Sequence, residues 1–193
     1  MTIATATKFY TAEDYLALEV DADMRSEFRN GELVEMTGGT PEHNEIVRMF
    51  VFLLTAALRQ QPHSIFVTDQ RLWIPDTNLY TYPDVMVTQR PPDLKPGRRD
   101  TVMNPILIGE TLSESTQGYD RGKKFAHYRT IETFQEYVLI DQYRPHVEHY
   151  VKQATNQWLF MEYDSLEATF RLSSVPVEIA LADLYEAIEF EAD

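Results

Sequence analysis

The chain has 193 residues, of which 44% are hydrophobic, a length and composition that suit one domain with a substantial core. The lack of cysteine excludes a disulfide framework and a thiolate metal site, and no apolar run is long enough to span a membrane. A net charge of -14 argues against indiscriminate binding to nucleic acid, because phosphate contacts require lysine and arginine.

The N-terminal segment predicts a short helix followed by a hairpin. Residues 11–14, Thr-Ala-Glu-Asp, have the form of a capping box, so a helix should begin there and run through Leu18. Asn30-Gly31 lies between two short runs, and both residues tolerate the positive φ of a tight hairpin turn. Because residues 1–10 lack the apolar core of a signal peptide, we expect a cytoplasmic protein.

A long helix and a strand are expected next. Thr40 suits the N-cap and Pro41 the first helical position, so the helix should run from there to about Gln60. Residues 46–58 are apolar almost all round, which predicts that the helix is buried against a sheet. Residues 65–74 indicate a single strand that is bent near its middle, and a turn follows it.

Two further apolar strands each contain one carboxylate. Asp84 opens the apolar run of a strand over residues 82–88, and Glu110 closes a second run over residues 105–109. Two carboxylates on neighbouring strands, with an ammonium group nearby, are typical of a site for a hard divalent cation. The alternative is that both acids only mark the ends of strands.

The connection between these two strands is rich in charge. Residues 90–104 contain several prolines and little periodicity, so we expect a long exposed loop of the kind that is often functional. The window 90–129 contains 8 of the 17 basic residues and 5 of the 31 acidic ones, a net charge of +3 in an acidic chain. Four basic side chains of the loop are therefore expected to contact the backbone of a substrate: Arg90, Lys95, Arg98 and Arg99.

Beyond Glu110, a polar connection leads to a helix and to a last core strand. Asp120 suits the N-cap of a helix that reaches about Thr130. Residues 134–140 form an apolar strand that follows a helical crossover, so it should lie parallel to the Glu110 strand. The remaining segments predict a meander of shorter strands and a final helix, over residues 147–151, 158–163, 168–172 and 182–189.

These elements predict a mixed α/β (α+β) fold in a single domain over residues 1–193. Between about residues 40 and 141 the order is helix, three strands, helix, strand, which is an αβββαβ core around a mixed central sheet. The N-terminal helix and hairpin and the C-terminal meander are expected as additions to this core.

That order resembles the PD-(D/E)XK (restriction endonuclease-like) nuclease superfamily, and more closely its Uma-two branch, with Asp84 on the second core strand and Glu110 on the third. The resemblance covers roughly residues 9–188. Gly109 and Thr111 depart from the β-branched residues of that branch, which we expect to weaken strand packing. The matching segments are residues 27–32, 41–43, 82–84, 109–116 and 119–125.

The position of the lysine also departs from the superfamily pattern. The third strand of that pattern usually contains Glu-x-Lys, whereas Leu112 occupies the lysine position here. In this branch the lysine is found on the following helix, which indicates Lys124. Side chains on a helix lean toward its N-terminus, so a lysine one turn into the helix can reach back to Glu110. Lys123 is the rival, but it should face about 100° away around the helix.

The resemblance implies metal-dependent hydrolysis of phosphodiester bonds in DNA. Asp84 and Glu110 would bind Mg²⁺, or Mn²⁺ as a substitute, together with the backbone carbonyl of Thr111. The metal would polarise the scissile phosphate and lower the pKa of a bound water. Lys124 would orient that water or stabilise the charge that develops on the phosphate.

Other residues in the matching segments are candidates for supporting roles. Glu27 could be an additional acidic ligand, or it could pair with a neighbouring arginine on a surface strand. His43 could belong to the site, or it could cap its helix or make a buried hydrogen bond. We expect the start of the helix to bind the phosphate backbone of the substrate through the side chains of Arg121 and Lys123 and the N–H groups between them.

Three functions remain open. The set Asp84, Glu110 and Lys124 favours a metal-dependent DNA endonuclease. The net charge of -14 favours a catalytically inactive nucleic-acid- or protein-binding module that retains the nuclease fold. The third is a metal-dependent hydrolase of another phosphate ester. DNA is the expected partner, no membrane association is expected, and a homodimer is left open.

Overall fold

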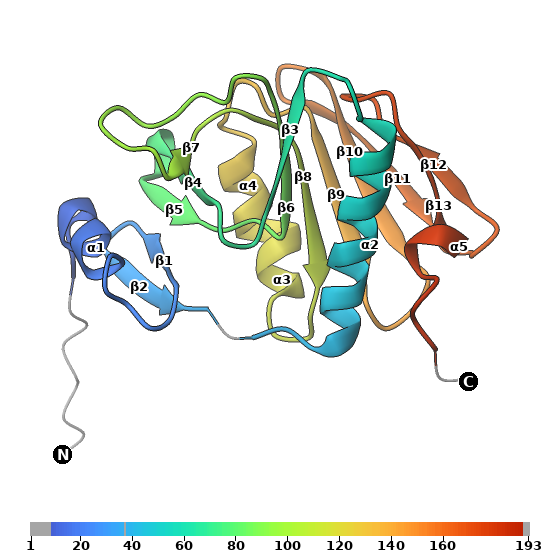
Figure 1. Cartoon of the computed structure of the whole chain (residues 1–193), viewed down its shortest axis with the longest axis horizontal. Helices are drawn as coiled ribbons and strands as arrows, with labels where there is room; N and C mark the ends of the chain where they lie inside the picture. Colours follow the sequence, from blue (N-terminus) through green and yellow to red (C-terminus); the bar gives the residue numbers. More distant parts are fainter. Residues whose placement is uncertain (1–8, 37, 191–193) are drawn as a thin grey trace.

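The computed structural model describes residues 9–36 and 38–190, and it contains a six-stranded sheet, a five-stranded sheet and a two-stranded sheet (Figure 1). The helical elements are α1 (Ala12–Leu18), α2 (Pro41–Ala57), η1 (Pro75–Thr77), α3 (Gln117–Tyr119), the π-helical turn η2 (Asp120–Lys124), α4 (Phe125–Tyr128) and α5 (Leu181–Leu184). The strands are β1 (Ser26–Arg29), β2 (Glu32–Glu35), β3 (His63–Val67), β4 (Arg71–Ile74), β5 (Leu79–Thr81), β6 (Val85–Gln89), β7 (Thr101–Val102), β8 (Pro105–Leu112), β9 (Glu136–Asp141), β10 (Val147–Ala154), β11 (Gln157–Tyr163), β12 (Thr169–Arg171) and β13 (Glu178–Ala180).

The six-stranded sheet has the order β11-β10-β9-β8-β6-β3, and it confirms the predicted core. Along the chain its elements follow as α2, then β3, β6 and β8, then the helical segment α3–η2–α4, then β9. The β8–β9 pair is parallel, with Glu110 opposite Leu139, while β3–β6 and β6–β8 are antiparallel. The sheet is therefore mixed, as a strand that returns through a helical crossover requires.

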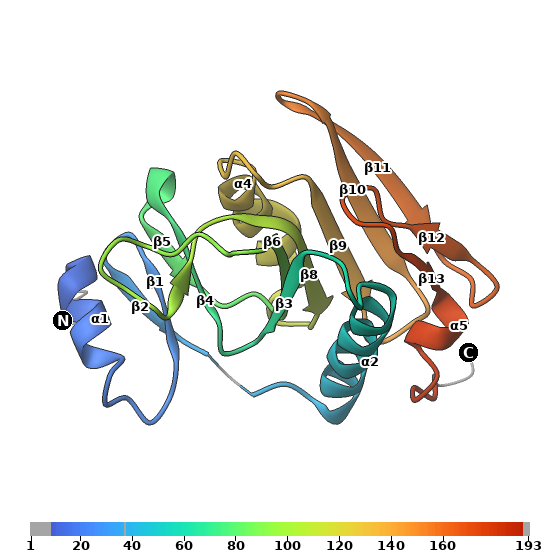
Figure 2. The ribbon, with the colours of Figure 1, turned by 45° about the horizontal axis from the view of Figure 1, so that its top comes forward.

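Helices and the smaller sheets cover both faces of this sheet (Figure 2). One face packs against α2, α5 and the β12–β13 hairpin, in a core cluster that includes Phe50, Leu107 and Phe170. The other face packs against α4 and the five-stranded sheet, in a cluster that includes Ile108 and Tyr128. In the part of the chain that the structure describes, no helix is both long and apolar enough to cross a membrane.

The prediction of one bent strand over residues 65–74 was wrong, because this segment forms two strands in different sheets. β3 pairs in the six-stranded sheet, and a tight turn after Val67, in which Gln70 N–H donates to the Val67 carbonyl, leads to β4. β4 belongs to the five-stranded sheet β2-β1-β5-β4-β7. The loop after β6 is likewise not wholly irregular, since β7 lies within it and pairs with β4 in parallel.

The N-terminal hairpin is part of this second sheet, not an addition to the core. Asn30 and Gly31 adopt φ values of +47° and +106°, as the hairpin prediction required. β1 then pairs with β5, with Phe28 opposite Tyr80, and this pairing holds the hairpin beside the beginning of β6. The hairpin is consequently in a position to contribute side chains to the site described below.

Helix α2 packs on the sheet with one side only. Thr40 caps it by accepting the backbone N–H of His43 at 3.1 Å, as predicted. The predicted burial against a sheet is confirmed for the inner side of the helix, while Phe52 on the outer side is 58% exposed. The inner side packs closely on β8: a Cβ on Gly109 would lie 2.5 Å from Cε1 of Phe50. Gly109 therefore provides space for the Phe50 ring and does not weaken the packing as expected.

The helix before β9 begins earlier than predicted. Asp120 was expected as its N-cap, but Asp120 has helical angles (φ -64°, ψ -45°) and follows α3 directly. Ser113 explains the earlier start, since its side chain accepts the N–H of Thr116 at 3.2 Å and its carbonyl accepts that of Gln117 at 2.9 Å. The C-terminal helix is also shorter than the predicted 182–189, because α5 ends at Leu184.

The C-terminal strands form the predicted meander only in part. β9, β10 and β11 pair in antiparallel order, whereas β12 pairs with β13 in a separate hairpin. Beneath that hairpin, Glu136 of β9 and His149 of β10 are completely buried, with 2.6 Å between Glu136 Oε1 and His149 Nε2. Glu136 also accepts the backbone N–H groups of Ser173 and Ser174 at 2.7 and 2.9 Å. This cluster ties the hairpin to the sheet.

Candidate active site

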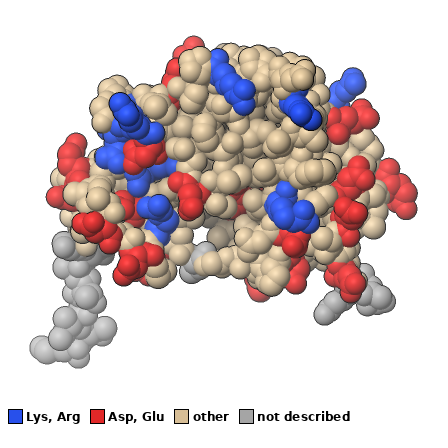
Figure 3. All heavy atoms as spheres, viewed as in Figure 1, with Lys and Arg blue, Asp and Glu red and all other residues tan. Residues whose placement is uncertain are grey.

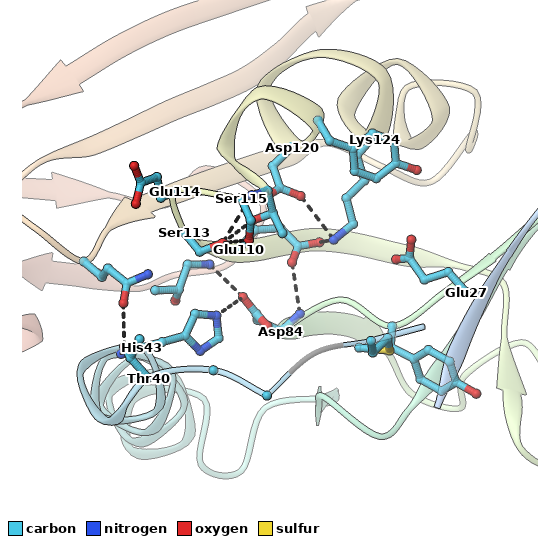
Figure 4. A pocket seen from close by; sticks show the side chains of 18 of the residues that line it. Glu27, Thr40, His43, Asp84, Glu110, Ser113, Glu114, Ser115, Asp120 and Lys124 are labelled. Carbon is cyan, nitrogen blue, oxygen red and sulfur yellow. Dashed lines mark hydrogen bonds and ion pairs between the residues drawn. The ribbon is translucent and has the colours of Figure 1, made fainter. Parts of the chain in front are cut away.

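A pocket of about 570 Å³ opens where β6 begins and β8 ends (Figure 4). Its walls come from the β1–β2 hairpin, the segment before α2, the first turn of α2, and the polar connection with η2 that follows β8. Its lining contains a surplus of acidic side chains over cationic ones. The carboxylates are Glu27, Glu35, Asp84, Glu110, Glu114 and Asp120, and the lysine and arginine side chains are Arg29 and Lys124.

The structure brings Asp84 and Glu110 together on neighbouring strands. Asp84 directly precedes β6, and Val85 of β6 lies opposite Gly109 of β8 in the antiparallel pair. Asp84 and Glu110 occupy the next position along this pair and therefore lie opposite each other. The backbone N–H of Asp84 donates to Glu110 Oε2 at 3.2 Å, and the N–H of Thr111 donates to Asp84 Oδ2 at 2.8 Å. Each carboxylate is thus fixed by the backbone of the opposite strand.

Lys124 reaches the same carboxylates from η2. Its Nζ lies 2.8 Å from Glu110 Oε1 and 3.3 Å from Asp120 Oδ1. Burial favours the neutral amine, but the charges of Glu110, Asp120 and Glu27 hold the pKa of Lys124 well above its usual value. Lys124 is therefore a cation, whereas the neighbouring Lys123 is exposed to solvent, as the helical phase predicted.

The charge of Glu110 is only partly compensated. Burial raises its pKa, the charge of Lys124 lowers it, and repulsion by Asp84 and Asp120 raises it further, so that the pKa of Glu110 lies at about 8. The hydroxyl of Tyr128 donates to Glu110 Oε1 at 2.7 Å, so this oxygen has two donors. Glu110 and Asp120 share one buried lysine here, and the Asp84 carboxylate lies beside Glu110 without a share in it, an arrangement that favours binding of a further cation.

His43, whose role was left open, lies beside Asp84. Its Nε2 is 3.2 Å from Asp84 Oδ2, so it makes a hydrogen bond within the pocket. Burial would lower the pKa of His43, but the hydrogen bond to Asp84 and the charges of Asp84 and Glu110 raise it. A Cβ on Gly39 would lie 2.9 Å from His43 Nδ1, so glycine at that position leaves room for the ring.

Glu27 pairs with a neighbouring arginine, which is one of the two roles considered for it, although Glu27 is buried and not on the surface. It is 5% exposed, lines the pocket, and accepts from Arg29 at 2.6 and 2.9 Å and from the hydroxyl of Thr81. Burial would raise the pKa of Glu27, but the charge of Lys124 and the bonds from Thr81 and Arg29 lower it. Glu27 is thus paired with a neighbouring arginine and also faces the lysine of the pocket.

The expected substrate-backbone residues of the long loop do not reach the pocket. Arg90 follows Gln89 at the end of β6 opposite to Asp84, and it donates to Ser64 at 3.2 Å. Lys95 lies over the ring of Trp73, and Arg98 pairs with Asp100. None of the four, Arg99 included, is among the described pocket-lining residues. Figure 3 shows blue side chains gathered over this loop at the left.

The basic residues of η2 are also placed differently from what was expected. Arg121 donates to Glu148 of β10 at 2.6 Å and to Gln117 at 2.6 Å, so its guanidinium is bound within the fold. Because the helical segment begins at Gln117, the backbone N–H groups of residues 121–123 lie inside it and not at its start. Lys123 is the exposed cation of this turn.

Three residues of the site were missed in the sequence. Tyr128 donates a hydrogen bond to Glu110, and Asp120 forms an ion pair with Lys124. The third is Arg29, which stacks over the ring of Tyr119 with 3.8 Å from Cζ to the ring centre. A signal for two of them was present, since residues 120, 124 and 128 are four apart and share one helical face. The position of Arg29 depends on the pairing of β1 with β5, which no local pattern encodes.

The donor set suits a hard cation. Within residues 9–36 and 38–190, no group of three or more His, Cys, Asp or Glu side chains is arranged to hold a metal ion by itself. Asp84 and Glu110 supply two carboxylates, and Mg²⁺ is commonly held by one or two carboxylates with water and substrate oxygens. In an extended strand the N–H and C=O of one residue point to the same side, so the carbonyl of Thr111 faces Asp84 as its N–H does.

The chain is similar to known proteins along most of its length. The family model Uma2, described as "Putative restriction endonuclease", matches residues 12–183. Two proteins of Synechocystis sp. are similar along most of the chain. The protein sll1609 is 40% identical over 177 residues (92% of this chain, 100% of the relative), and slr1290 is 31% identical over 178 residues (92% of each).

A solved structure has the same fold. The crystal structure of "a putative nuclease belonging to DUF820" from Anabaena variabilis superposes with a TM-score of 0.74 and 19% sequence identity, covering 92% of this chain and 98% of that chain. This likeness confirms the restriction endonuclease-like fold predicted from the order of the elements. The family description supports nuclease activity in general.

Proposed function

This chain belongs to the Uma2 family, and from that premise we propose that it is a metal-dependent endonuclease that hydrolyses phosphodiester bonds of DNA. The observation that carries the proposal is the pairing of Asp84 and Glu110 on adjacent strands with the buried ammonium group of Lys124, all in one open pocket. A fold alone would not support an activity, but a site with these groups does.

Asp84, Glu110 and the carbonyl of Thr111 would hold Mg²⁺, or Mn²⁺ in its place. When bound, the metal supplies a Lewis acid for the phosphate and a water of lowered pKa. The surplus of carboxylates in the pocket supports a requirement for a bound metal ion, because these negative charges repel a phosphate group until a cation offsets them. His43 donates to Asp84 Oδ2 when its Nε2 is protonated, and so fixes the orientation of that carboxylate.

Lys124 is the fixed cation of the proposed reaction. Its Nζ is held by Glu110 and Asp120, so its position is defined before substrate arrives. A preorganised ammonium group of this kind stabilises negative charge that builds on the attacked phosphate, or orients the attacking water, without further reorganisation. The raised pKa of Lys124 supports the first role, because the group stays protonated over the physiological pH range.

The decisive experiment is cleavage of supercoiled plasmid with Mg²⁺, with Mn²⁺ and with EDTA, comparing the wild type with Asp84→Asn. We expect cleavage that requires metal and falls at least about a hundredfold in Asp84→Asn, because the amide is a poor ligand for a hard cation. Asp76→Asn is the matched control, since Asp76 is exposed in η1 and away from the pocket lining.

Two outcomes would contradict the proposal. Equal activity of Asp84→Asn and the wild type would place the chemistry elsewhere. Binding of DNA without any metal-dependent cleavage would instead support the inactive binding module that the net charge of -14 favours. Hydrolysis of small phosphate esters without cleavage of DNA would support the third function considered above.

A further inference from the structure

The strand β11 is a free edge of the six-stranded sheet. It pairs with β10 over its whole length, and among the described residues no strand pairs with its other side. Every second residue of its seven, 157–163, therefore directs its backbone N–H and C=O away from β10, so that these groups form a row along the outer side. Such a row is a template for pairing with another strand.

The other sheet edges are protected, whereas β11 is not. β7 has two residues, and β2 has four, of which Glu32 and Glu35 are charged. β3 has five residues, and Arg90 donates to its Ser64, which brings a cation beside that edge. Short length and charge are the usual means by which edges avoid pairing. β12 and β13, the strands of the two-stranded sheet, have three residues each. β11 is thus the longest of the outer strands in the described part of the chain, contains no proline, and has Glu162 as its one charged residue.

The middle of β11 is exposed and apolar on both faces of the sheet. Leu159 and Phe160 are 46% and 45% exposed, and as consecutive strand residues they point to opposite faces. Phe160 leans on Tyr150 of β10, with 4.8 Å between the ring centres, so its position is fixed. An edge that offers apolar side chains on both faces can bury them on both sides of an added strand.

We propose that the β11 edge is a homodimer interface, in which a second copy of this chain adds its own β11 in antiparallel orientation. The two-fold axis would pass beside Phe160, so that Phe160 of one copy lies opposite Phe160 of the other. This centre pairs all seven residues of the strand and extends the sheet from six strands to twelve.

The sequence of the strand favours its own copy as the occupant. In this register, residue 159 lies opposite 161, and Glu162 lies opposite Trp158, so no like charges oppose each other. Lys152 of β10 lies opposite Trp158 of β11 within one copy. Glu162 of the second copy, on the other side of Trp158, therefore approaches the charge of Lys152. The pairing is complementary in charge as well as in its apolar centre.

Sedimentation velocity between about 1 and 500 μM tests the interface, over the range in which weak dimers form. We expect a concentration-dependent dimer for the wild type. Phe160→Lys and Phe160→Glu should each weaken it at least about tenfold, because like charges would lie directly opposite. An equal mixture of the two variants should dimerise again. Phe52→Lys, at a 58% exposed position on the outer side of α2, is the control and should associate like the wild type.

The absence of cysteine from the chain allows a second test that depends on the register. Directly opposite strand residues have Cβ atoms about 4.5–5.5 Å apart, close to the separation that a disulfide spans. Mild oxidation should therefore cross-link Phe160→Cys into a dimer, while Phe52→Cys stays monomeric. A wild type that remains monomeric throughout, or a dimer that Phe160→Lys leaves intact and Phe160→Cys does not cross-link, would overturn the proposal.

Discussion

Two buried carboxylates on neighbouring strands illustrate how differently the same group can be used in one sheet. Glu136 of β9 and Glu110 of β8 face opposite sides of the sheet, and each contacts a basic side chain. Glu136 accepts from His149, from two backbone N–H groups and from a hydroxyl, all within the closed C-terminal cluster. Glu110 instead shares Lys124 with Asp120 and opens onto a pocket.

Their pKa shifts have opposite signs, and this is what the comparison teaches. Burial would raise the pKa of Glu136, but its hydrogen bonds from His149, Ser174 and Ser173 lower it. Burial and two neighbouring carboxylates raise the pKa of Glu110 to about 8, although Lys124 opposes them. A carboxylate whose bonds are complete within the fold stabilises the fold, whereas one with uncompensated charge beside a pocket is ready to bind a cation.

The largest expected effect is on stability. Glu136→Gln should lower the free energy of unfolding by about 3 kcal/mol, because it replaces the acceptor of several buried donors with a partly mismatched amide. Glu110→Gln should cost less than about 0.5 kcal/mol in the metal-free protein, because it also removes repulsion from Asp84 and Asp120. Urea unfolding of both variants in EDTA measures the difference. Equal losses of unfolding free energy in the two variants would contradict the distinction between a carboxylate that stabilises the fold and one that does not.

The next largest effect concerns turnover. Lys124→Ala should reduce single-turnover cleavage about a hundredfold or more while metal binding persists, because the fixed positive charge beside the phosphate is lost. Lys123→Ala, one residue away and exposed, is the matched control and should mainly weaken DNA binding. If Lys123→Ala abolishes cleavage and Lys124→Ala does not, the assignment of the two lysines is reversed.

A smaller effect is expected from Tyr128→Phe. The Tyr128 hydroxyl and Lys124 both bind Oε1 of Glu110, which leaves Oε2 toward Asp84. Loss of the hydroxyl should weaken Mn²⁺ binding about tenfold, because a bond that orients a metal-binding carboxylate is removed. Calorimetric titration with Mn²⁺ measures this affinity independently of cleavage. Tyr137→Phe removes an equally buried hydroxyl that contacts the Asp120 carbonyl, and its Mn²⁺ affinity should stay unchanged.

The smallest effect is a dependence of stability on pH. The folded-state pKa of Glu136 is lowered, so its contribution is present above its unfolded-state pKa and is lost as the pH falls through the folded-state value. The difference in unfolding free energy between the wild type and Glu136→Gln should therefore narrow as the pH falls below about 4.5. Urea unfolding at several pH values between about 3 and 7 follows this difference. A difference that is constant over this range would exclude the linkage.

The order of the core elements could be predicted because each has a local signal. The cap at Thr40, the Asn30-Gly31 turn, the apolar run after Asp84 and the apolar run before Glu110 are contained in short stretches of sequence. The break between β3 and β4 could not be predicted, because residues 68–70 contain neither glycine nor proline. β7 was missed for a different reason: two residues become a strand only because β4 lies beside them.

The candidate site was predictable to the extent that it depends on spacing along one element. Lys124 lies where the helical phase placed it, beside Glu110. The long loop after β6 was wrongly expected to reach the pocket. A segment that is close to Asp84 in sequence can leave the strand at the end far from Asp84. Arg90 leaves β6 at one end, and Asp84 enters it at the other, five strand residues away. The pairing of Glu27 with a neighbouring arginine was considered from the sequence, but the place of Arg29 over the ring of Tyr119 could not be predicted, since it depends on a distant strand pairing.

The π-helical turn over residues 120–124 makes the site sensitive to chain length as well as to side-chain identity. A π turn contains one residue more than an α-helical turn of the same span. Deleting Gly122 would restore regular α-helix: Lys124 and Tyr128 would keep their places in the core, while Asp120 would lie three residues before Lys124 instead of four, about 60° from it around the helix, which would disturb the ion pairs of Asp120 with Lys124 and of Arg121 with Glu148. The alignment of two halves of one short helix thus depends on a single inserted residue, and a one-codon deletion would undo it without changing any residue that contacts Glu110.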